Sequence, residues 1–116
     1  QEASFVKYAI NSYLGMKVTF FNQLHDAALD FSCSPQRIID AVAADNRIGY
    51  SHTRVPGFDG KKGFGGACLP KDMNAFVKFN QDLTLIAESV KINNKMREEY
   101  ELDEREKNNN IKFEDK

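Results

Sequence analysis

The stretch GFGGACLPKD, residues 63–72, places a cysteine directly behind three glycines, with a lysine and an aspartate following within four residues. The flanking glycines leave the thiol of Cys68 accessible, Lys71 lies three residues on, and a helix starting at Pro70 would direct its positive end toward the sulfur. These features favour a thiolate, so Cys68 is a candidate nucleophile. The alternative is a small buried hydrophobe, which free cysteines often are.

Other uses of the thiol have less support. A thiol hydrolase would need a base, and His25 and His52, the two histidines, could reach Cys68 only through the tertiary fold. We expect no metal site, because two cysteines and two histidines show no recognised ligand spacing. We expect a reduced, cytoplasmic chain, with a Cys33–Cys68 disulfide as the alternative.

Glycine-rich loops often bind phosphates. Neither a dinucleotide-binding G-x-G-x-x-G nor a P-loop is present, because Cys68 occupies the third glycine position and no Gly-Lys-hydroxyl run occurs. The stretch from residue 47 to residue 72 nevertheless carries five Arg and Lys residues against two Asp residues. Such a surplus, together with backbone amides, suits an anionic ligand such as a diphosphate, unless it is only a solvated basic loop.

The elements that must position these residues are helices. The recurrence of apolar residues over Ala3–Phe31 predicts one long helix, whose inward stripe would be Val6, Ile10, Tyr13, Phe20, Leu24, Ala27 and Phe31. Four further apolar residues lie off that stripe: Phe5, Leu14, Val18 and Phe21. A helix with two apolar faces needs a second partner, and a symmetric copy of the chain is the commonest one.

Three shorter helices are predicted at 35–45, 71–80 and from Thr84 to about 96, with a long glycine-rich loop over 46–69. Ser34 and Pro35 form a helix-start signal. Residues 97–116 hold eight acidic and five basic residues, which indicates a frayed helix end and a disordered tail. The fold class is therefore all-α, with a helical domain over 1–96.

Composition limits the partners. The chain has 116 residues, a net charge of −1 and no apolar run approaching the length of a membrane span. We therefore expect no nucleic-acid or membrane partner. Lys7 and Asn11 are four residues apart and share one helix face, which matters only if that face looks toward the glycine loop.

Three segments, KYAINSYLGMKVTFFNQL, DNRIG and GFGGACLPKD, occur in an order that resembles the central domain of the UDP-glucose/GDP-mannose dehydrogenase family, over roughly Ala3 to Asn80. The resemblance implies a helical dimer core between an NAD-binding domain and a nucleotide-binding domain. It implies oxidation of a sugar C6 alcohol to a carboxylate by two hydride transfers, through a cysteine thiohemiacetal and thioester. NAD would bind in a domain absent from this chain, so the isolated chain is expected to be inactive.

By the same resemblance, Cys68 is the nucleophile, Lys7 and Asn11 hold the developing oxyanion, and Asp72 assists water and proton transfer. Such fixed donors can be worth ~3–4 kcal/mol each. Four substrate-binding residues are also implied, with the arginine reaching the neighbouring subunit's substrate: Arg47, Gly65, Gly66 and Lys71. The sequence departs from the family pattern in SHTRVPGFDGKK, which lengthens the loop.

The favoured hypothesis is the central domain of a nucleotide-sugar 6-dehydrogenase acting on UDP-glucose. GDP-mannose and UDP-N-acetylmannosamine are the alternative substrates. A second hypothesis is a non-catalytic helical dimerisation module that retains the motifs, and a third is the thiol hydrolase using Cys68 and His52.

Overall fold

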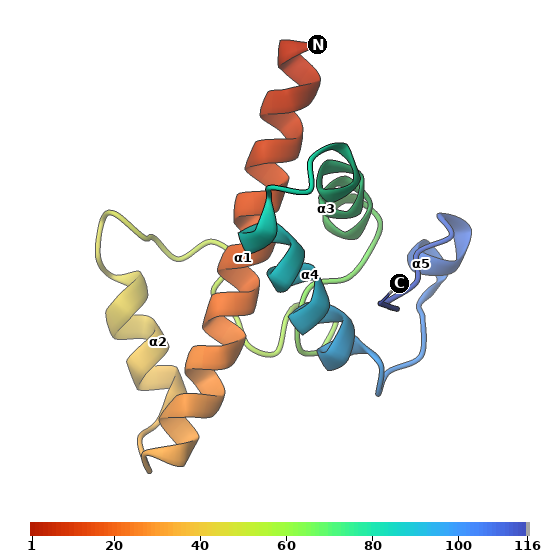
Figure 1. Ribbon diagram of the computed structural model, residues 1–116. Helices are drawn as coiled ribbons and strands as arrows, with labels where there is room; N and C mark the ends of the chain where they lie inside the picture. Colours follow the sequence, from red (N-terminus) through yellow and green to blue (C-terminus); the bar gives the residue numbers. More distant parts are fainter. Residues whose placement is uncertain (116) are drawn as a thin grey trace.

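The computed structural model describes residues 1–115 and contains five α-helices over that range, without a strand (Figure 1). The all-α class is confirmed. The helices, in chain order, are α1 (Glu2–Asp30), α2 (Pro35–Ala43), α3 (Cys68–Phe79), α4 (Thr84–Arg97) and α5 (Glu104–Asn108).

α1 is the long central helix, and α2, α3 and α4 all pack on it (Figure 1). Where α3 and α4 meet α1, the buried apolar residues are Phe64, Met73, Phe76 and Ile86. Where α2 and the following loop meet α1, they are Phe21, Ile39 and Val55. The domain therefore has two small apolar clusters on either side of one helix.

The predicted inward stripe of α1 is wrong. Five of its members have more than half of their surface exposed: Val6, Ile10, Tyr13, Phe20 and Phe31. The buried positions are instead small or polar, namely Ser12, Gly15, Thr19 and Asn22, together with Phe21 and Ala28. A Cβ on Gly15 would collide with the Met73 side chain, which is fully buried. Small residues therefore let α3 approach α1 closely, and this glycine is a packing feature.

The starts of two helices follow from their sequences. Ser34 caps α2, its hydroxyl accepting a hydrogen bond from the Arg37 N–H at 3.5 Å, and Pro35 is the first helical residue, as predicted. α3 begins at Cys68, three residues before the predicted 71–80 helix, with Pro70 inside its first turn. A proline is tolerated there because first-turn amides need no intrahelical acceptor. Cys68 is therefore part of the helix.

The C-terminal segment differs from the expected disordered tail. Asp103 and Glu106 form a capping box that starts α5, and Glu106 and Ile111 are buried. The composition suggested disorder because the segment is highly charged, whereas its key charged groups have partners in the glycine loop. Lys116, the last residue of the expected tail, lies outside the described residues.

Two further findings apply to residues 1–115. None of the helices described there is long and apolar enough to cross a membrane. The same residues bring together no group of three or more histidine, cysteine or acidic side chains that could hold a metal ion.

Candidate functional site

Asp72 is the centre of the candidate site. Its side chain, on α3, is 1% exposed, and its Oδ2 accepts a hydrogen bond of 2.6 Å from the Asn11 amide of α1. The Lys7 ammonium, one turn earlier on α1, lies 3.9 Å from the same oxygen. The structure thus brings together three of the residues that the sequence singled out, although Asn11 and Asp72 are 61 positions apart in the chain.

One carboxylate oxygen of Asp72 is buried without a hydrogen-bond donor. Its Oδ1 accepts no hydrogen bond from the described residues, and the nearest cation is the Lys71 ammonium at 3.7 Å. A buried carboxylate oxygen without a donor can accept a hydrogen bond from a water molecule or a substrate hydroxyl. Asn11 also has a second amide hydrogen to donate, and the Lys7 side chain is 60% exposed.

Cys68 lies one helical turn before Asp72, so the two residues share a face of α3. Its side chain is exposed and free. Cys33, in the turn after α1, is also exposed and free, so the alternative Cys33–Cys68 disulfide is not formed. Within the described residues, His52 forms no hydrogen bond with Cys68, and the structure therefore offers no support for the thiol-hydrolase hypothesis.

Protein side chains hold the amides of the glycine loop. The Gly63 N–H donates to Asn22 Oδ1 at 3.1 Å, and the Phe64 N–H donates to Asn93 Oδ1 at 2.7 Å. The Asn93 amide donates back to the Phe64 carbonyl at 2.9 Å, so the pair is reciprocal. These amides are therefore not free to bind a phosphate, which corrects the simplest interpretation of the loop as an anion cradle.

Gly65 and Gly66, the predicted substrate-binding glycines, lie so close to neighbouring side chains that a larger residue would not fit. A Cβ on Gly65 would collide with Arg97 and Glu106, and one on Gly66 would press against Arg105 at 3.2 Å. Gly66 additionally has a φ of +78°, which favours glycine. The buried residues that hold this loop were missed in the sequence: Asn22, Asn93, Arg97 and Glu106. Only the Asp103-x-x-Glu106 capping box left a recognisable signal.

Arg47 lies apart from these contacts. It is exposed in the turn after α2 and binds Asp45 through its backbone N–H, Nε and Nη2 at 2.8–3.0 Å. These hydrogen bonds hold the pKa of Asp45 below its ordinary value and raise that of Arg47. Within one chain, Arg47 does not join the contacts of Lys7, Asn11 and Asp72.

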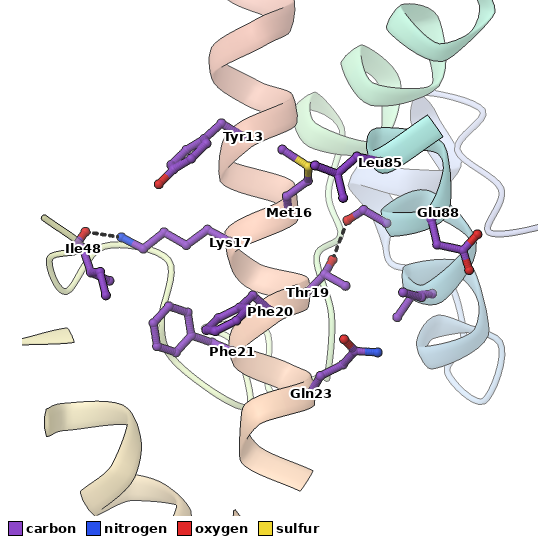
Figure 2. A pocket seen from close by; sticks show the side chains of 12 residues that line it. Tyr13, Met16, Lys17, Thr19, Phe20, Phe21, Gln23, Ile48, Leu85 and Glu88 are labelled. Carbon is purple, nitrogen blue, oxygen red and sulfur yellow. Dashed lines mark hydrogen bonds between the residues drawn. The ribbon is translucent and has the colours of Figure 1, made fainter. Parts of the chain in front are cut away.

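A second surface feature is an apolar groove of about 430 Å³ between α1, α4 and the turn after α2 (Figure 2). Tyr13 and Phe20 line it from α1, Leu85 lines it from α4, and Lys17 donates to the Ile48 carbonyl at its edge, at 2.7 Å. None of the predicted catalytic residues lines this groove.

The sequence matches one protein family. The central-domain model of the UDP-glucose/GDP-mannose dehydrogenase family matches residues 1–97. The chain belongs to this family.

Individual relatives sharpen the comparison. The chain is 34% identical over 92 residues to a UDP-glucose 6-dehydrogenase of Rhizobium meliloti (strain 1021), covering 76% of this chain and 20% of that protein. It is 37% identical over 101 residues to a UDP-glucose 6-dehydrogenase of Streptococcus pneumoniae, covering 85% and 24%. It is 34% identical over 74 residues to a GDP-mannose 6-dehydrogenase of Pseudomonas aeruginosa, covering 63% and 16%.

The chain thus spans about a fifth of the length of these relatives. No solved structure gave a significant match.

Proposed function

We propose that this chain is the cysteine-bearing central domain of a UDP-glucose 6-dehydrogenase that oxidises the sugar C6 alcohol to a carboxylate. The observation that carries the proposal is the meeting of Lys7 and Asn11 with the buried Asp72, one helical turn from the exposed Cys68. Family membership and the names of the relatives support the reaction class.

The proposed chemistry assigns a step to each residue. The Cys68 sulfur adds to the C6 aldehyde formed by the first oxidation, giving a thiohemiacetal. Lys7 and the free amide hydrogen of Asn11 stabilise the oxygen that carries the developing charge. Loss of a hydride from this carbon gives a thioester. Water held by Asp72 Oδ1 then attacks the thioester, releasing the carboxylate and the thiol.

When bound, NAD would supply the hydride acceptor for each of the two oxidations, and in this proposal it would bind to a domain outside residues 1–116. The nucleotide sugar would contact Arg47, Gly65, Gly66 and Lys71. UDP-glucose is the favoured substrate because most of the similar relatives carry that name, and GDP-mannose is the second candidate because of the Pseudomonas aeruginosa relative. The proposed location of this activity is the cytoplasm.

The proposed active form is a homodimer joined along α1. Support comes from the exposed apolar residues of α1, which include Val6, Ile10 and Tyr13, and from the apolar groove beside them. A symmetric copy is the commonest cover for such a surface. In a dimer, Arg47 could complete the site of the neighbouring copy, which would explain why it stands apart within one chain.

The nucleophile is tested with Cys68→Ala in the full-length dehydrogenase that contains this chain. Without the thiol, the aldehyde forms no thiohemiacetal, so we expect at most one NADH per UDP-glucose and no glucuronate product. The unmodified enzyme should form two NADH per sugar. Cys33→Ala is the matched control and should behave as the unmodified enzyme.

Two NADH per sugar from the Cys68→Ala enzyme would contradict the assigned role. A full-length protein that oxidises no nucleotide sugar at all would instead support the non-catalytic dimerisation module.

A further inference from the structure

The segment over residues 98–115 follows the part of the chain that the family model matches, yet it contacts the glycine loop at several points. The Lys61 ammonium donates to the Glu101 carbonyl at 2.8 Å, and the Lys62 N–H donates to the Tyr100 hydroxyl at 3.3 Å. α5 then brings Glu106 against the last glycines of the loop. The loop is therefore held by a segment that the family match leaves unexplained.

Glu106 is the innermost of these contacts. Its side chain is 1% exposed, and each of its oxygens accepts a backbone N–H: Oε1 from Asp103 at 2.9 Å, and Oε2 from Gly66 at 2.9 Å. A glutamine would have only one acceptor oxygen for these two donors. The position therefore needs a carboxylate in order to tie α5 to the loop.

Arg97 provides the counter-charge and a second tie. Its Nη1 lies 3.7 Å from Glu106 and donates to Asp59 at 2.9 Å, and its Nη2 donates to the Gly63 carbonyl at 3.0 Å. Both Arg97 and Glu106 are buried, so each compensates a charge that would otherwise be costly. Together they hold the loop at residue 59, at Gly63 and at Gly66.

We propose that Glu106 is a positioning residue for Cys68, an inference that rests on the proposed function. Gly66 is two residues before Cys68 and directly precedes Ala67, the N-cap of α3. With its φ of +78°, Gly66 turns the loop into the helix, and the hydrogen bond to Glu106 holds that turn. Glu106 thus determines where α3 starts and how its first residue, Cys68, is presented.

The test is the rate at which iodoacetamide alkylates Cys68 in the 116-residue chain, with Cys33 of the same molecule as the internal reference. The thiolate is the reacting species, and an ordered helix start stabilises negative charge. Glu106→Ala releases the turn, so we expect the Cys68 rate to fall about two- to fivefold relative to Cys33. If the only effect of Glu106→Ala were the loss of a negative charge near Cys68, the alkylation rate of Cys68 would rise instead.

Two control variants separate positioning from loss of stability. Glu104→Ala changes an exposed residue of the same helix, and Ile39→Ala lowers the melting temperature from the other apolar cluster. Both should leave the Cys68 to Cys33 ratio unchanged. If Glu106→Ala does not fold, Glu106→Gln, which keeps one acceptor oxygen, should show a smaller decrease of the same sign.

An unchanged or faster Cys68 rate in a folded Glu106 variant, or an equal decrease in Ile39→Ala, would overturn the positioning role. The proposed function has a separate readout, since it fails if Cys68→Ala leaves the NADH stoichiometry of the full-length enzyme unchanged. The two failures can therefore be told apart.

Discussion

The two faces of α1 differ in a way that reverses the usual expectation for a helix. Apart from Phe21, its buried residues are small or polar, such as Ser12, Gly15 and Thr19, whereas the opposite face exposes apolar residues such as Tyr13. Packing within this domain therefore depends on close backbone approach and specific hydrogen bonds. Much of the apolar side-chain area of α1 is exposed to solvent in this chain.

Two polar side chains of the buried face, Thr19 and Asn22, have partners, whereas the buried Ser12 hydroxyl has none among the described residues. The Ser89 hydroxyl of α4 donates to the Thr19 hydroxyl at 3.0 Å, and Asn22 accepts from the Gly63 N–H. Because buried polar groups are costly without partners, each of these contacts specifies one neighbour and one register. An apolar stripe would allow helices to slide more freely, so the polar face makes the arrangement of α3, α4 and the loop more specific.

The largest loss of stability is expected at Gly15, where the buried face of α1 has no space for a larger side chain. Gly15→Val should lower the free energy of unfolding by about 3 kcal/mol, because its side chain must displace the buried Met73. The measurement is urea denaturation followed by circular dichroism. Met73→Ala alone should also destabilise, but the double variant should be more stable than the sum of the two changes by about 1 kcal/mol or more. Simple additivity would mean that the α1–α3 approach does not depend on this contact.

A smaller effect is expected where the buried face loses a polar partner at nearly constant volume. Asn22→Leu leaves the Gly63 N–H buried without its acceptor and should cost about 1–3 kcal/mol in the same denaturation experiment. The matched change of a buried apolar side chain is Met73→Leu on α3, which should cost less than about 1.5 kcal/mol. If both variants lowered the free energy of unfolding equally, the buried hydrogen bond of Asn22 would contribute no more to stability than ordinary apolar packing.

The smallest effect on folding is expected on the exposed apolar face. Tyr13→Arg should change the free energy of unfolding of the monomer by no more than about 0.5 kcal/mol. If α1 forms the proposed dimer interface, the same change should weaken dimerisation about tenfold or more, measured by sedimentation equilibrium. Phe79→Arg, at an exposed apolar position on α3, is the control and should leave association unchanged. A purely monomeric unmodified chain would contradict the dimer proposal directly.

Local signals in the sequence were enough to predict four of the five helices in the described residues, α1 to α4. The period of α1, the Ser34-Pro35 start of α2 and the turn residues over 46–66 act over a few positions, so the all-α class and most helix bounds could be predicted. The spacing of Cys68, Lys71 and Asp72 in one short motif is likewise a local property. It indicated a chemical site before any contact was known, and the catalytic roles assigned to its residues stay proposals.

Only the tertiary structure decided which face of α1 is buried, because an apolar stripe is the same whether a neighbouring helix or another molecule covers it. The contact of Asn11 with Asp72 joins residues 61 positions apart, and no local rule predicts such a distance. The order of the C-terminal segment has the same origin. Its high charge is typical of a disordered tail. The segment is ordered because Glu106 contacts Gly66 and Arg97, whose positions depend on how the loop folds across the domain.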